Sequence, residues 1–169
     1  MSLQSTQYSF LAEMLQKKYP PPQKNWRVIW RNKEYLSYAV NFENGTYFAN
    51  EEGLLVSFDG WQVVGLNLPG LGVNKVADID HHKQLDGYRL LTYKDGLGRS
   101  VSIDRCEPWE KIINNAPANE GTQVWWLQRC RSGDHNYRNQ IKLNDRGQLV
   151  GLVFTVMKKM DPVVIESIQ

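Results

Sequence analysis

One stretch decides the fold that this sequence predicts: Gly53-Leu-Leu-Val-Ser-Phe-Asp-Gly-Trp-Gln-Val-Val-Gly-Leu66. Asp59-Gly60 separates two apolar runs that favour strands. An Asp-Gly in that place is typical of a two-residue hairpin turn, because both central residues need a positive φ. The expected pairs are Phe58–Trp61, Val56–Val63, Leu54–Gly65 and, on the other face, Leu55–Val64. Apolar residues occupy both faces, which predicts a hairpin in the middle of an antiparallel sheet.

Short strands separated by turn residues continue on both sides of this hairpin. Towards the N-terminus, residues 26–31 alternate between apolar and polar, and apolar residues recur at every second position of 36–42. Asn44-Gly45 is a further turn signal, and it precedes a strand over 46–49. Towards the C-terminus, strands are expected over 87–93, 99–106, 122–129, 137–143, 148–156 and 163–168. The glycine of Asn144-Asp-Arg-Gly147 suits the left-handed position of a three-residue hairpin loop.

Residues 5–18 are predicted to form a helix, because apolar side chains recur there at helical spacing and Pro20-Pro21-Pro22 ends the pattern. The polar segment 75–84 is ambiguous, and 109–116 is expected to be a short helix or a loop. The predicted fold is mainly β: a single antiparallel meander sheet, forming a sandwich or an open barrel, with the N-terminal helix packed on it. Residues 1–169 are expected to form a single domain.

Composition limits the classes of function. The chain has 169 residues, of which 41% are hydrophobic and 22% charged, as in an ordinary folded domain. A net charge of +2 does not by itself indicate a nucleic-acid-binding protein. No apolar run of about 20 residues predicts a membrane-spanning helix. Met1-Ser2-Leu3 precedes no signal-peptide pattern and resembles an added leader, so the native N-terminus and its export signal stay open.

Two clusters suggest catalytic or metal chemistry, and both are weak. Asp78-Ile-Asp80-His81-His82 contains metal-ligating residue types, but adjacent histidines diverge in an extended chain, which favours a solvated polar loop. His135 lies near Cys130 in the sequence, as in a nucleophile–base pair, but no family-type cysteine motif accompanies them. The sequence therefore predicts no metal, no cofactor and no enzyme. A hydrolase using Asp80, His81 or His135 is kept as an alternative.

Basic and aromatic residues alternate in two regions. The basic residues are Lys17, Lys18, Lys24, Arg27, Arg31 and Lys33 in the first region and Arg129, Arg131, Arg138, Lys142 and Arg146 in the second. Such a pattern fits either an anionic polymer bound by guanidinium and aromatic groups or a half-buried strand face. Trp125 and Trp126 must point to opposite faces of a strand, which leaves open which of them is outward. The candidate binding residues are Trp125, Trp126, Arg129, Arg131, Tyr137 and Arg138.

The only cysteines are Cys106 and Cys130. Their spacing matches no CxxC metal or redox pattern. The sequence is compatible with a disulfide between the two cysteines and equally with two buried free thiols.

Two stretches of the chain resemble one known family. They are residues 50–66 and His135-Asn-Tyr-Arg-Asn-Gln-Ile-Lys-Leu-Asn-Asp-Arg-Gly-Gln-Leu-Val150, followed by a Pro-containing segment and a short terminal strand. In this order they are similar to the YjbF-type (group 4 capsule polysaccharide) lipoproteins of Gram-negative envelopes. The resemblance covers about a third of the chain. This sequence departs from the family at Trp61, where the family tends to have Arg, and at Gln140-Ile141, where it tends to have an aromatic pair.

The resemblance implies a non-catalytic, exported accessory protein that assists capsule or exopolysaccharide assembly or export. It implies a location in the periplasm or at the outer membrane, with the cytoplasm as the alternative. An oxidising compartment favours a Cys106–Cys130 bridge. The expected partner is an envelope protein or an anionic polysaccharide and not nucleic acid, with membrane contact only through a lipid anchor that lies outside this chain.

A second class of function remains beside this hypothesis. Apolar residues on both strand faces also fit a ligand carrier, a half-barrel that holds a lipid or another apolar molecule on its concave side. The sequence does not identify the ligand or the oligomeric state.

Overall fold

A computed structural model describes residues 23–69, 77–85, 88–94, 99–114, 123–155 and 161–168. Their regular structure consists of strands alone: β1 (Trp26–Trp30), β2 (Lys33–Phe42), β3 (Gly45–Ala49), β4 (Leu55–Phe58), β5 (Val63–Asn67), β6 (Ala77–Leu85), β7 (Tyr88–Lys94), β8 (Ser100–Cys106), β9 (Glu110–Asn114), β10 (Gln123–Ser132), β11 (His135–Leu143), β12 (Leu149–Phe154) and β13 (Val163–Ser167). None of these residues forms a helix that could cross a membrane. The predicted helix 5–18 lies outside the described residues.

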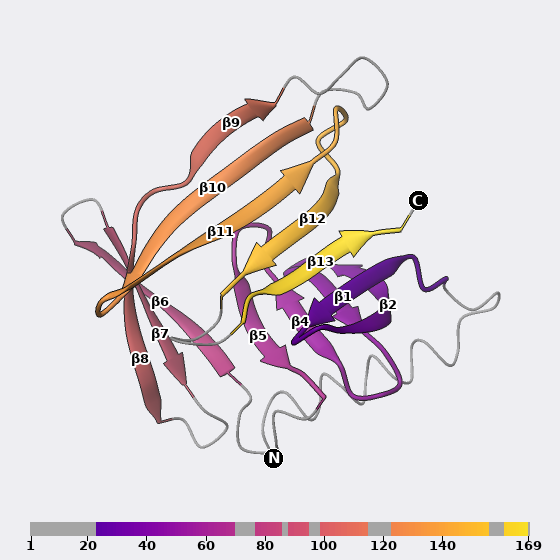
Figure 1. Cartoon of the computed structure of the whole chain (residues 1–169), viewed down its shortest axis with the longest axis horizontal. Coiled ribbons are helices and arrows are strands. Elements are labelled where there is room, and N and C mark those ends of the chain that lie inside the picture. Colours follow the sequence, from indigo (N-terminus) through magenta and orange to yellow (C-terminus); the bar gives the residue numbers. More distant parts are fainter. Residues whose placement is uncertain are drawn as a thin grey trace.

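The strands form one antiparallel sheet that curves into a half-barrel (Figure 1). Neighbours follow chain order from β1 to β8, as the predicted meander requires, and β10 to β13 continue the sheet until β13 pairs with β1. The segment β6–β8 is joined to the rest by two short junctions. At the first, Gly65 and Leu66 of β5 pair with Asp78 and Ala77 of β6. At the second, Arg105 and Cys106 of β8 pair with Arg131 and Cys130 of β10.

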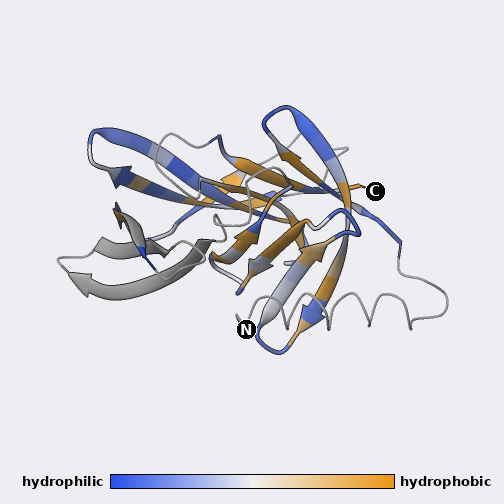
Figure 2. Ribbon diagram, turned by 90° about the horizontal axis from the view of Figure 1, so that it is seen from below, coloured by the Kyte–Doolittle hydropathy of each residue, from blue (hydrophilic) through white to orange (hydrophobic). Residues whose placement is uncertain are grey.

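Alternating side chains build the core on the inner face of the sheet. Trp26, Val28 and Trp30 of β1 are buried there, and the turn residues between strands are mostly hydrophilic (Figure 2). Every residue of β4 is buried, which confirms a central strand with two covered faces. Its outer side belongs to a second buried cluster, made by Val40, Tyr47, Ala49 and Leu55. We call the two sides of the sheet the core face and the outer face.

The register predicted for the β4–β5 hairpin is wrong. The observed pairs are Leu55–Asn67, Val56–Leu66, Ser57–Gly65 and Phe58–Val63, with a bulge between Ser57 and Phe58. The connection comprises residues 59–62, because the Asp59 carboxylate accepts hydrogen bonds from the backbone N–H groups of Trp61 (2.9 Å) and Gln62 (2.8 Å). An aspartate side chain that binds nearby backbone donors competes with the shorter turn.

Other local expectations also change. Residues 78–82, expected as a polar loop, lie in β6, and residues 110–114, expected as helix or loop, form β9, because pairing with β7 and β10 outweighs their local preferences. The alternating residues of 36–42 face away from the main core: Val28 pairs with Tyr35 and Trp26 with Ser37, so Leu36 lies on the outer face and is 52% exposed.

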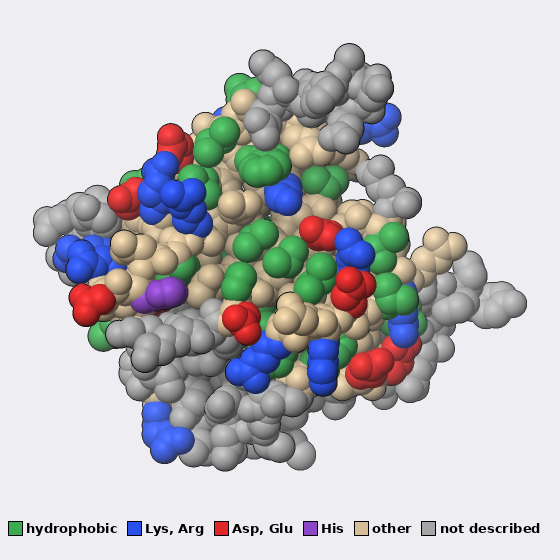
Figure 3. Space-filling model, in the orientation of Figure 1, with side chains coloured by type: hydrophobic (Ala, Val, Ile, Leu, Met, Phe, Trp, Pro, Cys, Tyr) green, Lys and Arg blue, Asp and Glu red, His purple; other side chains and the backbone are tan. Residues whose placement is uncertain are grey.

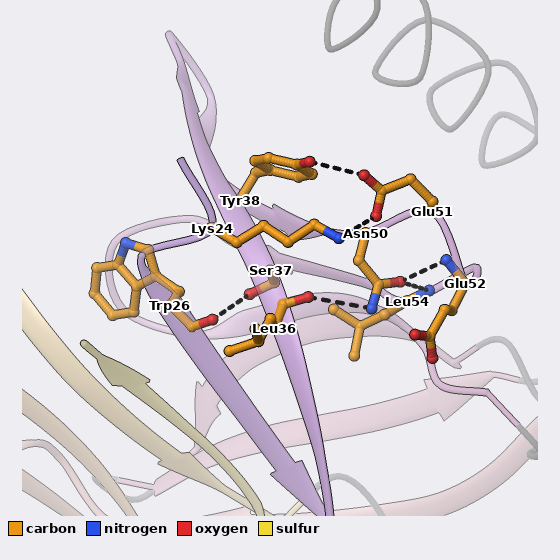
Figure 4. Close-up of polar contacts among 9 residues, drawn as sticks. All are labelled: Lys24, Trp26, Leu36, Ser37, Tyr38, Asn50, Glu51, Glu52 and Leu54. Carbon is orange, nitrogen blue, oxygen red and sulfur yellow. Dashed lines mark hydrogen bonds and ion pairs between the residues drawn. The ribbon is translucent and has the colours of Figure 1, made fainter. Parts of the chain in front are cut away.

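A buried amide joins β2 to the β3–β4 connection (Figure 4). The Asn50 side-chain oxygen accepts hydrogen bonds from the backbone N–H groups of Glu52 (3.0 Å) and Leu54 (3.1 Å), and its Nδ2 donates to the Leu36 carbonyl (3.3 Å). Beside it, the Glu51 carboxylate contacts Lys24 Nζ (2.6 Å) and accepts from the Tyr38 hydroxyl (2.7 Å). The hydrogen bond from Lys24, followed by that from Tyr38, lowers the pKa of Glu51 from 4.5 to about 2.

We expect Gly45→Ala to destabilise the protein by about 3 kcal/mol, because Gly45 has φ +141° and an added Cβ would overlap the Phe58 carbonyl oxygen. Gly53→Ala is the matched control: Gly53 also has a positive φ (+91°), but nothing lies near the position of its Cβ. The control should lose only about 1 kcal/mol, the backbone contribution. Urea unfolding measures both, and equal losses would contradict a steric role for Gly45.

We expect Lys24→Met to raise the Glu51 pKa from about 2 towards 4.5. Because folding lowers this pKa, the contact contributes stability above about pH 4.5 that is lost as the pH falls towards 2. NMR titration of the Glu51 carboxyl measures the pKa directly. Lys33→Met removes the same charge at the start of β2 and should leave the Glu51 pKa unchanged; equal shifts in the two variants would show a general charge effect instead.

Candidate functional site

A hollow of about 610 Å³ lies where β8, β10 and β11 meet. Its walls are formed by Arg105, Glu107, Arg129, Cys130, Arg131, Asn136, Tyr137 and Arg138. Figure 3 shows basic side chains gathered over this end of β10 and β11, with hydrophobic side chains in the middle of the same face. We call the set Arg105, Arg129, Arg131 and Arg138 the arginine quartet.

Strand register places the arginine quartet in two opposed pairs. Arg129 of β10 lies opposite Arg138 of β11, and Arg131 lies opposite Arg105 of β8. Arg129 and Arg131 are two residues apart, so both side chains project from the outer face, where all four arginines are exposed. Like charges directly opposite each other destabilise an antiparallel pair. Two such pairs side by side concentrate positive charge at one place on the outer face.

Acidic groups neutralise only part of this charge. The Arg129 guanidinium contacts the carboxylates of Glu110 (2.8 Å) and Glu107 (3.6 Å), and the Glu110 hydrogen bond raises the pKa of Arg129 above its ordinary value. Arg131 donates to the Gly133 carbonyl (2.6 Å) and lies 3.9 Å from the Asp134 carboxylate. Within the described ranges, no carboxylate forms an ion pair with Arg138. Arg138 therefore keeps its guanidinium group available to an outside anion.

The Cys106–Cys130 disulfide closes the β8–β10 junction beside the hollow. Both cysteines are buried on the core face, one residue along from the Arg105–Arg131 pair. Of the two alternatives that the sequence left open, a disulfide or two free thiols, the structure shows the disulfide.

Buried polar groups support the hollow from beneath. The Tyr137 hydroxyl donates to the fully buried Asp104 carboxylate, and Asn139 Nδ2 donates to Gln128 Oε1 (3.3 Å). Gln128 Nε2 in turn donates to the backbone carbonyl of Glu107 (3.2 Å). Hydrogen bonds between buried polar groups fix the positions of the strands that carry them. They hold β8, β10 and the start of the β8–β9 connection in one arrangement around the arginines.

The structure separates the six predicted binding residues between two faces. Arg129, Arg131 and Arg138 are brought together on the outer face, and Tyr137 contributes to the wall of the same hollow with a buried side chain. Trp125 also lies on the outer face, with Lys142 Nζ 5.0 Å from its ring centroid. Trp126 lies on the core face, packed against the main core. Because side chains alternate between the two faces along β10, Trp125 is the tryptophan that lies on the outer face.

The residues of the hydrolase alternative do not meet on neighbouring strands. Asp80 and His81 lie in β6 and His135 begins β11, and β6 has only β5 and β7 as neighbours in the described sheet. The His135 ring is exposed and stacks on Tyr137 at 6.4 Å. No group of three or more His, Cys, Asp or Glu residues that could hold a metal occurs among those described.

Three residues of the first basic region are engaged in other contacts, and Lys17 and Lys18 lie outside the described residues. Lys24 contacts Glu51, Arg27 contacts Glu166 at 2.8 Å, and Arg31 lies 4.4 Å from the Trp30 ring centroid.

Sequence reasoning missed Arg105, which reaches the hollow through pairing between β8 and β10. It also missed the two-residue turn Gly133-Asp134, which sets the Arg129–Arg138 register. That turn had a local signal, since Gly-Asp between two strands is a hairpin connection.

The fold has a counterpart among solved structures. It is similar to the fold of a lipoprotein. The crystal structure of the hypothetical lipoprotein YmcC from Escherichia coli K12 matches with a TM-score of 0.57 and 10% sequence identity, over 100% of each chain. No protein-family profile and no curated protein matches this chain. At this identity the likeness shows the fold alone.

Replacing both cysteines with alanine should destabilise the protein by about 3 kcal/mol, the chain-entropy value for a disulfide that spans 24 residues. The loss has a local component, because the bridge lies next to the opposed Arg105–Arg131 pair at the short β8–β10 junction. Guanidinium unfolding measures it. Reduction of the wild-type protein is the matched control and should give the same loss; a variant as stable as the oxidised protein would show that the bridge does not support the fold.

Proposed function

We propose that this protein is a non-catalytic accessory protein of the cell envelope that binds an acidic glycan through the arginine quartet. The observation that carries the proposal is the pair of opposed arginines, Arg129–Arg138 and Arg131–Arg105, in one hollow. A planar guanidinium binds carboxylate or phosphate oxygens through two parallel hydrogen bonds. Four guanidinium groups in one place fit the repeated anionic groups of an acidic polysaccharide.

The outer face of β10 extends this site into a strip. Trp125 lies four residues from Arg129 and six from Arg131 on the same face, which corresponds to about 13 Å and about 20 Å along a strand. The Lys142 amino group adds a positive charge beside the Trp125 ring. An elongated strip with cations at both ends and an indole at one of them fits an extended anionic chain better than a single small anion.

Two further findings support an envelope role. The structural neighbour is a lipoprotein, and the chain contains a disulfide, which suits an oxidising compartment such as the periplasm. Assistance in capsule or exopolysaccharide assembly or export is the corresponding role that we propose. The apolar-ligand carrier remains the alternative function. No observation favours it, because the described core-facing side chains pack against one another.

Arg138→Glu tests the proposal, because its effect on glycan binding can be separated from its effect on stability. The variant replaces a repulsive pair with an attractive one opposite Arg129, so stability should be unchanged or slightly higher. Affinity for polygalacturonate should fall at least about tenfold, since a hydrogen bond to a charged group contributes about 1.5–3 kcal/mol. Calorimetric titration at fixed salt measures binding, and thermal unfolding measures stability.

Arg146→Glu is the matched control, because it makes the same charge change in the β11–β12 connection, outside the hollow. Glu110→Gln should strengthen binding, because it frees Arg129 from its closest carboxylate. Equal affinity of Arg138→Glu and the wild type for polygalacturonate would remove the arginine quartet as the glycan site.

A further inference from the structure

A cluster of tryptophans lies on the core face near the arginine quartet but on the other side of the sheet. The Trp61 ring centroid is 5.1 Å from that of Trp126 and 6.2 Å from that of Trp109, and Trp109 lies 6.1 Å from Phe154. Trp61 comes from the β4–β5 connection, Trp109 from the β8–β9 connection and Trp126 from β10. We call Trp61, Trp109 and Trp126 the tryptophan cluster.

The outermost indole of the cluster is both exposed and held in place. Trp61 is 45% exposed, although an indole gains more from burial than most side chains. Its position is fixed because Asp59 binds the backbone N–H groups of Trp61 and Gln62, and because its ring meets Trp126 edge to face. A large aromatic surface that is preorganised and open to solvent is suited to binding a ligand without loss of side-chain entropy.

A charged group beside the indoles indicates what such a ligand carries. The Lys111 amino group lies 6.0 Å from the Trp126 ring centroid. A ligand at the cluster thus meets aromatic faces and a cation together.

We propose that the tryptophan cluster is a second glycan subsite that binds a pyranose ring of the acidic chain held by the arginine quartet. The C–H groups on one face of a pyranose carry partial positive charge and are attracted by the negative face of an indole. A sugar carboxylate pairs with Lys111. The inference rests on the proposed function for its ligand class.

One short segment links the two subsites. Residues 107–111 present Glu107 and Glu110 to Arg129 on the outer face, and Trp109 and Lys111 to the tryptophan cluster on the core face. Within the described sheet, β9 pairs only with β10, so this segment runs along an edge. A glycan that crosses the edge meets the arginine quartet on one side and the tryptophan cluster on the other.

Three probes separate the two subsites. Cellohexaose offers pyranose rings without charge, polyphosphate offers charge without pyranose rings, and hexagalacturonate offers both. We expect both sugars to change the intrinsic tryptophan fluorescence of the full-length protein. Trp61→Ala should weaken both sugars about tenfold, the usual range for loss of one aromatic stacking partner, and leave polyphosphate binding unchanged. Trp61→Phe keeps an aromatic ring and should restore most of the affinity.

The outcomes distinguish failure of this inference from failure of the proposed function. Wild-type affinity of Trp61→Ala for both sugars, or an equal loss for polyphosphate, would overturn the assignment of the cluster to a pyranose. No binding of either sugar to the wild type would overturn it as well. Arg138→Glu should weaken polyphosphate and hexagalacturonate but not cellohexaose. If Arg138→Glu weakens the binding of neither anionic probe while Trp61→Ala weakens the binding of cellohexaose, the arginine site is wrong and the tryptophan subsite is supported.

Discussion

The Cys106–Cys130 disulfide joins β8 to β10 at a short junction that places two arginines opposite each other. Two residue pairs join these strands in the described sheet, and one of them is Arg105–Arg131. A covalent bond next to that pair of like charges keeps the strands in register, and the register keeps the arginine quartet in one hollow. The stability of the fold and the charge density of the proposed site therefore depend on the same bond.

Most of the strands could be predicted from the sequence, because period-2 alternation and turn residues are local signals. The burial of both faces of β4 followed from its apolar run. Register could not be predicted at the β4–β5 connection, where the side chain of Asp59 binds two backbone donors and lengthens the turn. The strands β6 and β9 were missed because pairing with their neighbours outweighs a composition that is weak in strand formers.

The predictable part of the candidate site is the part made by one hairpin. Arg129, Arg131 and Arg138 are close in the sequence, and the β10–β11 hairpin needs only its Gly133-Asp134 turn to bring them together. Arg105 and Trp61 could not be found in this way, because they arrive from β8 and from the β4–β5 connection. Contacts between segments distant in the sequence carry no local signal, so the parts that Arg105 and Trp61 play are visible only in the folded chain.

The two junctions of the β6–β8 segment differ in kind, and we expect them to differ in their resistance to local unfolding. At one end β8 is tied to β10 by a covalent bond, whereas at the other β5 meets β6 through the pairs Gly65–Asp78 and Leu66–Ala77. Two residue pairs without a covalent bond separate more easily than two strands joined by a disulfide. We therefore expect local unfolding of the segment to begin at the β5–β6 junction, while the disulfide keeps the arginine side closed.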